Sequence, residues 1–159
     1  MYPHAVARKF PGEVPVSAIE PIAAGELIRH DGITLQAIHT PGHATDHLCF
    51  YWLEERALFS GDLILGEGTA VIPRVGGSLM DYLASLKRLR SLDIRRMYPG
   101  HGPVIEDPPA KITEYIEHRH MRERQVLDAL QAGARTIREM VARIYADVPR
   151  GLHPLAEES

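Results

Sequence analysis

The chain has 159 residues, of which 45% are hydrophobic, so it can bury one sizeable core with a small appendage. Its formal net charge of −3 gives no general positive field of the kind that marks nucleic-acid-binding proteins. A single cysteine, Cys49, excludes an internal disulfide and favours a reducing compartment such as the cytoplasm, while short apolar runs and a proline-rich start predict neither a membrane span nor a signal peptide.

The first third of the chain predicts strands. Residues 1–25 contain four prolines and predict extended coil with at most a short strand. A hairpin is predicted over residues 25–40, GELIRHDGITLQAIHT, because Asp31-Gly32 is a two-residue turn signal between alternating apolar positions. Two further strands are predicted in HLCFYWLE and ALFSGD, so that Asp62 follows the second of them, and a glycine-rich loop comes next. In the first of these strands we expect Cys49 to be a buried structural thiol rather than a nucleophile.

The rest of the chain predicts helices around one more strand. Ser78 followed by Asp81 resembles a capping box that opens a helix over residues 79–92. The apolar face of this helix would consist of Tyr82, Leu83, Leu86, Leu89 and Leu92. IRRMY predicts a strand that runs into the loop PGHG, with His101 inside that loop. Helices are then predicted from Ala110 to Gln131 and from the cap Thr136 to Tyr145.

Three polar residues each follow a predicted strand and lie in or beside a glycine-containing loop: His43, Asp62 and His101. Imidazole nitrogen and carboxylate oxygen are ligands that suit zinc, iron or manganese. Taken singly, each residue is more often an ordinary turn, cap or surface residue. His39, His43 and His47 have helical spacing in HTPGHATDH, but the Pro41-Gly42 turn signal excludes a helical metal stripe there.

The combination HTPGH-x-x-x-H, FSGD and YPGHG, in this order, resembles the metallo-beta-lactamase-fold hydrolases. The similarity is closer to the branch that contains beta-lactamase-like protein 2, through SGDLILGEGTAVI, DYLASLKRL and AKITEYIEHRHMRERQVLDAL, and it covers about residues 33–155. The resemblance implies that His43 binds a first zinc ion, that Asp62 bridges two ions, and that His101 binds the second. It gives no ligand role to His39 or His47, and it implies that His47 is a structural histidine beside the site.

The opening signature of that superfamily, H-x-H-x-D-H, is absent, since only the isolated His4 and His30 precede His39. The resemblance therefore implies an α+β (α/β) fold that is the C-terminal half of an αββα sandwich, with the chain starting inside a longer fold. Residues 1–108 would form a partial metallo-beta-lactamase domain. Residues 109–159 would form a helical, truncated winged-helix-like tail.

This departure has consequences for the metal site. The first ion would keep only His43 and Asp62, and the second only Asp62 and His101, whereas catalytic zinc normally has three protein ligands. We therefore expect one weakly bound zinc ion or none, and little or no hydrolysis by this chain alone. Half of a sandwich would also expose an apolar sheet face, which favours a homodimer or pairing with a complementary N-terminal fragment.

Three function hypotheses follow from the sequence. The first is a hydrolase that uses metal-bound hydroxide on a phosphodiester of single-stranded RNA or on a thioester such as hydroxyacylglutathione. The closer branch favours RNA, and KRLRSLDIRR could hold phosphates, although a solvated helix face explains the same run. The second is a non-catalytic remnant that acts as a binding or interaction module. The third, a DNA-binding helix-turn-helix, is disfavoured by the truncated, acidic tail.

Overall fold

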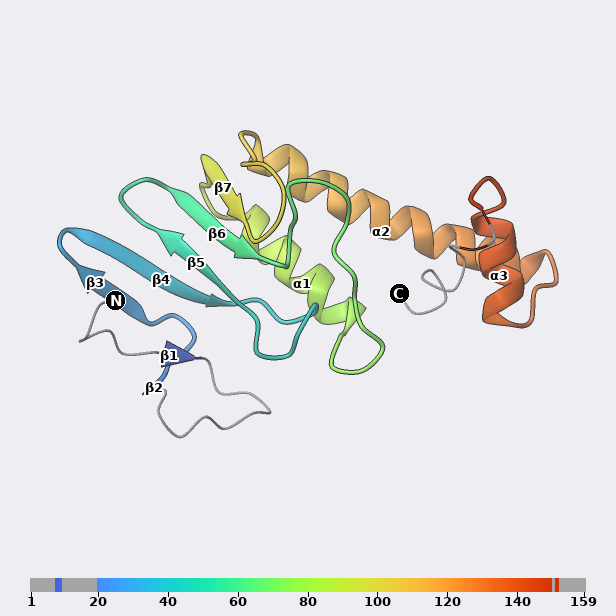
Figure 1. Cartoon of the computed structure of the whole chain (residues 1–159), viewed down its shortest axis with the longest axis horizontal. Helices are drawn as coiled ribbons and strands as arrows, with labels where there is room; N and C mark the ends of the chain where they lie inside the picture. The colour runs from blue at the N-terminus through green and yellow to red at the C-terminus, as the bar shows by residue number, and fades with distance from the viewer. Residues whose placement is uncertain (1–7, 10–19, 150, 152–159) are drawn as a thin grey trace.

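The computed structural model describes residues 8–9, 20–149 and 151, and it shows one mixed sheet with helices against one of its faces (Figure 1). Five strands form this sheet in the order β3-β4-β5-β6-β7: β3 (Leu27–His30), β4 (Ile33–His39), β5 (Leu48–Trp52), β6 (Ala57–Gly61) and β7 (Arg96–Pro99). Three helices follow: α1 (Leu79–Arg90), α2 (Pro108–Gln131) and α3 (Ile137–Ile144). The predicted mixed α and β architecture is confirmed.

Near its start the chain contributes two short strands, β1 (Arg8–Lys9) and β2 (Glu20–Pro21), which pair in parallel. Most of the predicted extended coil over residues 1–25 lies outside the described residues. The hairpin is confirmed, since β3 and β4 pair from Leu27↔Gln36 to His30↔Ile33. Both turn residues have positive φ, 45° at Asp31 and 80° at Gly32, as a two-residue hairpin turn of this kind requires.

The strand directions bring three loops to the same edge of the sheet. β4, β5 and β6 pair antiparallel in turn, so β4 and β6 run in the same direction. β7 pairs parallel to β6, with α1 as the crossover between them. The chain therefore leaves β4, β6 and β7 at one common edge, and the segments that begin there carry His43, Asp62 and His101.

One hydrophobic core lies between the sheet, α1 and the first half of α2. The prediction for α1 is confirmed in its main part, because Tyr82, Leu86 and Leu89 are fully buried and the Ser78 hydroxyl accepts from the Asp81 amide at 3.2 Å. Cys49 is also fully buried, and burial raises the pKa of its thiol to about 12, so it is the structural thiol that the sequence predicts. The buried residues from all three elements form a single cluster: Ile38, Cys49, Leu58, Leu63, Ile64, Ala70, Tyr82, Leu86, Leu89, Ile94, Met97, Ile105, Ile112, Tyr115 and Ile116.

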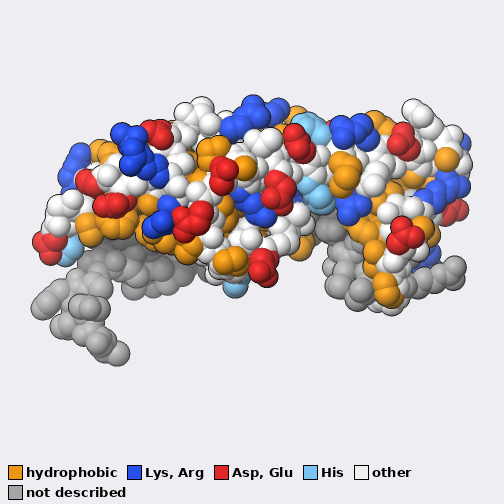
Figure 2. Space-filling view, turned by 90° about the horizontal axis from the view of Figure 1, so that it is seen from above, with side chains coloured by type: hydrophobic (Ala, Val, Ile, Leu, Met, Phe, Trp, Pro, Cys, Tyr) orange, Lys and Arg blue, Asp and Glu red, His pale blue; other side chains and the backbone are white. Residues whose placement is uncertain are grey.

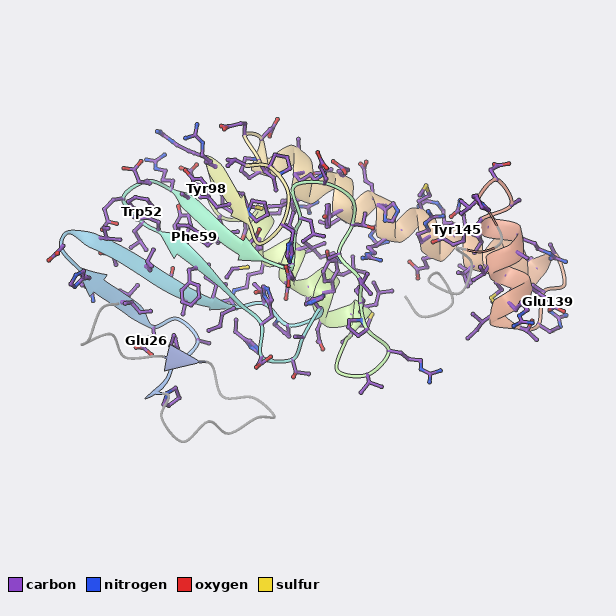
Figure 3. All side chains as sticks on the ribbon, in the orientation of Figure 1. Glu26, Trp52, Phe59, Tyr98, Glu139 and Tyr145 are labelled. Atoms are coloured by element: carbon purple, nitrogen blue, oxygen red, sulfur yellow. The ribbon has the colours of Figure 1, made fainter. Side chains whose placement is uncertain are left out.

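The opposite face of the sheet is apolar as well. Because side chains alternate along each strand, the residues between the core positions point away from α1. Ala37, Phe50, Phe59 and Tyr98 stand opposite one another on four adjacent strands, and the rings of Phe59 and Tyr98 stack with centroids 5.4 Å apart. Phe59 is 39% exposed. Figure 3 labels it with Tyr98 on the neighbouring strand. We call Phe50, Phe59 and Tyr98 the aromatic row.

Helix α2 begins two residues before the predicted start at Ala110. The Asp107 carboxylate accepts from the Ala110 amide at 3.1 Å, and prolines are tolerated in a first turn because amide hydrogens there have no partner within the helix. α2 then extends beyond the sheet and carries α3 at its far end (Figure 1). The predicted cap Thr136 forms a complete capping box with Glu139. Residues 150 and 152–159 of the tail lie outside the described part, and the truncated winged-helix interpretation and the boundary at residue 108 stay predictions.

No helix within the described residues is long and apolar enough to cross a membrane.

Candidate metal centre

The loop between β4 and β5 places His43 against the start of α1. Gly42 has φ of 139°, and a Cβ there would lie 2.4 Å from the Cα of Tyr82, so the loop approaches α1 more closely than any other residue type permits. The Gly42 carbonyl accepts from the Ser78 amide at 2.9 Å, and the Pro41 carbonyl accepts from the Ser85 hydroxyl at 2.7 Å. These contacts seat the loop on α1 and leave His43 half-buried beside it.

The imidazole of His43 has one nitrogen engaged. Its Nδ1 lies 2.7 Å from the carbonyl oxygen of Val71. A carbonyl oxygen only accepts hydrogen bonds, so Nδ1 carries the proton in this contact. When the ring is neutral, its Nε2 therefore presents a lone pair, which is the form of histidine that binds metals.

Asp62 and His101 meet where β6 and β7 end. The Gly100 amide donates to the Gly61 carbonyl at 2.8 Å, and a Cβ on Gly100 would lie 2.9 Å from Oδ1 of Asp62, so the two strand ends approach closely. The Asp62 Oδ1 and His101 Nε2 atoms are 3.4 Å apart, and both side chains are solvent-accessible. The structure thus brings together a carboxylate and an imidazole that are 39 positions apart in sequence, as the strand directions require.

His47 lies between these two parts of the site. Its Nδ1 contacts the Thr40 hydroxyl at 2.9 Å, and its Nε2 lies 2.8 Å from the place where a Cβ on Gly61 would be. Burial lowers the pKa of His47 most strongly; the nearby His43 lowers it further, while Asp62 opposes the shift. The neutral ring packs under the end of β6, in keeping with the structural role predicted for it, although that role stays a prediction.

The His39 ring contacts the backbone of its own loop. Its Nε2 contacts the carbonyl of Thr45 at 2.8 Å, within its own loop. This nitrogen is therefore a donor to the backbone in the structure. This contact does not test ligation, so the interpretation that His39 has no ligand role stays a prediction.

The loop over residues 62–77 contacts or contains all three candidate ligands. This role of the loop was not predicted from the sequence. The loop begins with Asp62, its Gly66 amide donates to the His101 carbonyl at 2.9 Å, and its Val71 carbonyl accepts from His43. The sequence marked this segment only as glycine-rich. The one available signal was Gly66 itself, where a Cβ would lie 2.2 Å from the Pro103 carbonyl oxygen, but such an approach cannot be inferred from a glycine alone.

The three donors do not form a complete metal site. Across residues 8–9, 20–149 and 151, no group of three or more His, Cys, Asp or Glu side chains is arranged to hold a metal ion. Asp62 and His101 are close, whereas His43 belongs to the neighbouring loop. The donor types fit zinc or iron, but their arrangement in this chain does not fit a full coordination shell.

A sequence profile of the metallo-beta-lactamase superfamily matches residues 2–101. The chain belongs to this superfamily. It is 48% identical over 120 residues to the beta-lactamase-like protein 2 homolog of Caenorhabditis elegans, covering 75% of this chain and 39% of that protein. The recognition of the superfamily and of this branch from the motifs is thereby confirmed.

Solved structures of the superfamily show the same fold. A metallo-beta-lactamase family protein from Thermus thermophilus has 32% identity and a TM-score of 0.72, covering 82% of this chain and 44% of that one. Another structure, solved in a di-iron-bound form, has 34% identity and a TM-score of 0.50, covering 66% of this chain and 48% of its own. The 159-residue chain therefore spans less than half the length of each of these three proteins.

Proposed function

We propose that this chain carries one corner of a metal-dependent hydrolase site, in which His43, Asp62 and His101 are the metal ligands and Asp62 is the bridging carboxylate. The observation that carries the proposal is the meeting of Asp62 and His101 at 3.4 Å, on the sheet edge from which the His43 loop also leaves. Membership of the superfamily supports it, as does the similarity to a protein solved in a di-iron-bound form.

By itself the chain is proposed to bind at most one zinc ion weakly and to have little or no hydrolytic activity. It contains no H-x-H-x-D-H sequence, and within the described residues its three candidate donors are not gathered around one ion as a catalytic zinc site needs. The atoms proposed to share one ion are Oδ1 of Asp62 and Nε2 of His101, which lie 3.4 Å apart.

The proposed substrate class is a phosphodiester of single-stranded RNA or a small thioester. For RNA, the basic run over residues 87–96 gives limited support. Arg96 in this run pairs with Glu106 at 2.9 Å, at the end of β7 opposite to His101. Basic and acidic side chains alternate over the surface seen in Figure 2 rather than forming one continuous basic groove.

Metal titration tests the proposed ligand corner. Isothermal titration calorimetry should show weak binding of zinc to the wild-type chain. The affinity of Asp62→Ala for zinc should be at least about tenfold lower. Asp93→Ala is the matched control, because Asp93 is also an exposed carboxylate paired with a basic side chain, Arg56 at 2.6 Å, outside the site. If Asp62→Ala and Asp93→Ala bind zinc alike, the proposal is wrong.

Activity assays test the second part. RNA and hydroxyacylglutathione are incubated with the chain and zinc, with and without a chelator. Little or no turnover is expected. Chelator-sensitive turnover that Asp62→Ala abolishes would support the ligand corner but contradict the prediction of inactivity.

A second candidate function, that of an interaction module, is favoured by the aromatic row. Phe59 is 39% exposed, and its ring stacks on the ring of Tyr98, its partner on the adjacent strand β7. We propose that a second copy of the chain packs on this face, since contiguous apolar surface favours association. Sedimentation velocity at about 100 μM, within the concentration range that promotes such association, should show a dimer that Phe59→Ser weakens. The control Val75→Ser, at a residue 87% exposed in the loop, should leave it intact, and a monomeric wild type would contradict the proposal.

A further inference from the structure

Two side chains of α2 hold the loop over residues 62–77. The Tyr115 hydroxyl accepts from the Leu65 amide at 3.0 Å and donates to the Gly68 carbonyl at 2.9 Å. One turn further along the helix, the guanidinium of Arg119 donates to the carbonyl of Ala70. The loop is therefore attached to α2 at points on either side of its middle.

The position of Arg119 is itself fixed by buried groups. Its guanidinium carbon lies 5.2 Å from the centroid of the Tyr82 ring, which is fully buried. The Tyr82 hydroxyl donates to the Leu63 carbonyl at 2.6 Å, and the Tyr82 backbone lies directly against Gly42. Arg119 thus rests on the residue that both site loops already contact.

A short covalent path leads from Arg119 to His43. Ala70 is 3% exposed, and the next residue, Val71, offers its carbonyl to Nδ1 of His43 at 2.7 Å. The peptide between Ala70 and Val71 is planar, so a hydrogen bond that fixes the Ala70 carbonyl also restricts the orientation of the residue that follows. The Val71 side chain is 56% exposed, so its own packing does little to hold the carbonyl in place.

We infer that Arg119 is a positioning residue for His43. By holding the Ala70 carbonyl, it aims the Val71 carbonyl at His43 and keeps the ring in its Nδ1–H tautomer, with the Nε2 lone pair free. Which nitrogen of an imidazole carries the proton is set by the hydrogen bond of the other nitrogen. The use of Nε2 as a metal ligand rests on the proposed function, whereas the tautomer is a property of the metal-free chain.

The tautomer is measurable by nuclear magnetic resonance without metal. Long-range ¹H–¹⁵N spectra of the ¹⁵N-labelled chain at about pH 8.5, where free imidazole is neutral, should show the Nδ1–H form for His43, assigned by comparison with His43→Gln. In Arg119→Met, which keeps an apolar stem over Tyr82 but removes the donors, the tautomer ratio should shift toward Nε2–H by about threefold to tenfold, as the loss of one hydrogen bond predicts. Arg119→Lys retains a donor and should restore much of the wild-type ratio.

Arg122→Met is the matched control. Arg122 lies three residues after Arg119 on the same helix, but its guanidinium carbon is 4.5 Å from the ring centroid of Tyr145 and it donates to the Gln125 side chain rather than to the loop. Its loss should therefore leave the His43 signal unchanged. An Nε2–H form in the wild type, or an unchanged ratio in a folded Arg119→Met, overturns the inference. If that variant does not fold, the wild type still tests the His43 contact. A scalar coupling across the hydrogen bond between His43 Nδ1 and the Val71 carbonyl carbon is expected, and its absence would contradict the inference. Failure of zinc binding with an intact Nδ1–H form would count against the proposed function alone.

Discussion

The two halves of α2 lie in different surroundings. In the first half, Ile112, Tyr115 and Ile116 are at most 6% exposed and belong to the core under the sheet. In the second half, Val126, Leu127 and Leu130 are 37–51% exposed. The same helix therefore belongs to a packed core at one end and has much less to pack against at the other, because the sheet has ended.

The attachment of α3 to the second half of α2 differs accordingly. Val141 is the buried residue of α3, and Arg143 donates to the carbonyls of Ala129 and Ala132 at 3.1 and 2.8 Å. Arginine donors that bond the last carbonyls of a helix are a common way to satisfy its end. Apolar burial stabilises the sheet region and the site, whereas capping and hydrogen bonds contribute a larger share of what holds the tail.

Core truncation should separate the two regions most strongly. Leu86→Ala in α1 removes a fully buried side chain and should lower the free energy of unfolding by about 2–5 kcal/mol. Leu127→Ala in the second half of α2, where the side chain is 51% exposed, should cost well under about 1 kcal/mol. Urea unfolding measures both, and equal losses would show that the tail has a core of its own.

Glycine replacement gives the next largest contrast. Gly42→Ala should cost about 3 kcal/mol, because the new Cβ meets the backbone of Tyr82 and cannot be accommodated by rotating a side chain. Gly133→Ala, at the turn between α2 and α3, has a similarly positive φ of 92° but open space around it. Gly133→Ala should lower the free energy of unfolding only by the backbone strain, about 1–2 kcal/mol. Thermal unfolding measures both variants, and equal losses of stability would show that the close approach at Gly42 is unimportant.

Removal of the helix cap tests the tail alone. Thr136→Ala takes away the hydroxyl that accepts from the Glu139 amide at 3.2 Å, and it should destabilise α3 by about 1 kcal/mol. Amide hydrogen exchange should speed up in α3 and stay unchanged in α1, if the two regions open separately. Equal acceleration in both helices would instead indicate one cooperative unit.

The smallest expected effect concerns pH. Burial lowers the pKa of His118 first of all, and the positive charges of Arg122 and Arg119 lower it further. The unfolded chain therefore binds a proton at His118 more readily than the folded chain does. The contribution of His118 to the free energy of unfolding is full above the ordinary histidine pKa of about 6.5. It is lost as the pH falls from there through the lower pKa of the folded state. His118→Gln should flatten this part of the curve of unfolding free energy against pH, and an unchanged slope would contradict the assignment.

Much of the secondary structure could be predicted because its signals are local. The Asp31-Gly32 turn, the Ser78 cap and the Thr136 cap each determine a boundary through contacts within a few residues. The start of α2 was predicted two residues late, since Pro108 and Pro109 conceal a cap at Asp107. Prolines in a first turn look like helix breakers until the position of the cap is known.

The candidate site was predictable only in part. His43, Asp62 and His101 could be chosen from the sequence because each follows a strand within a recognisable motif, and the structure brings Asp62 to His101. Val71 and Arg119 could not be chosen. Val71 acts through its carbonyl, which every residue possesses, and Arg119 acts across 49 positions of sequence on the carbonyl of Ala70.

The sequence by itself determined the superfamily, the strand and helix order, and the residue types available to bind a metal, because these depend on motifs and on local periodicity. Only the tertiary structure decided which donors meet, which nitrogen of His43 is left free, and which face of the sheet is without a helix. Those properties depend on the directions of β4, β6 and β7 and on carbonyl groups held by distant side chains. Backbone groups carry no sequence signal, so their role becomes visible only when the chain has folded around them.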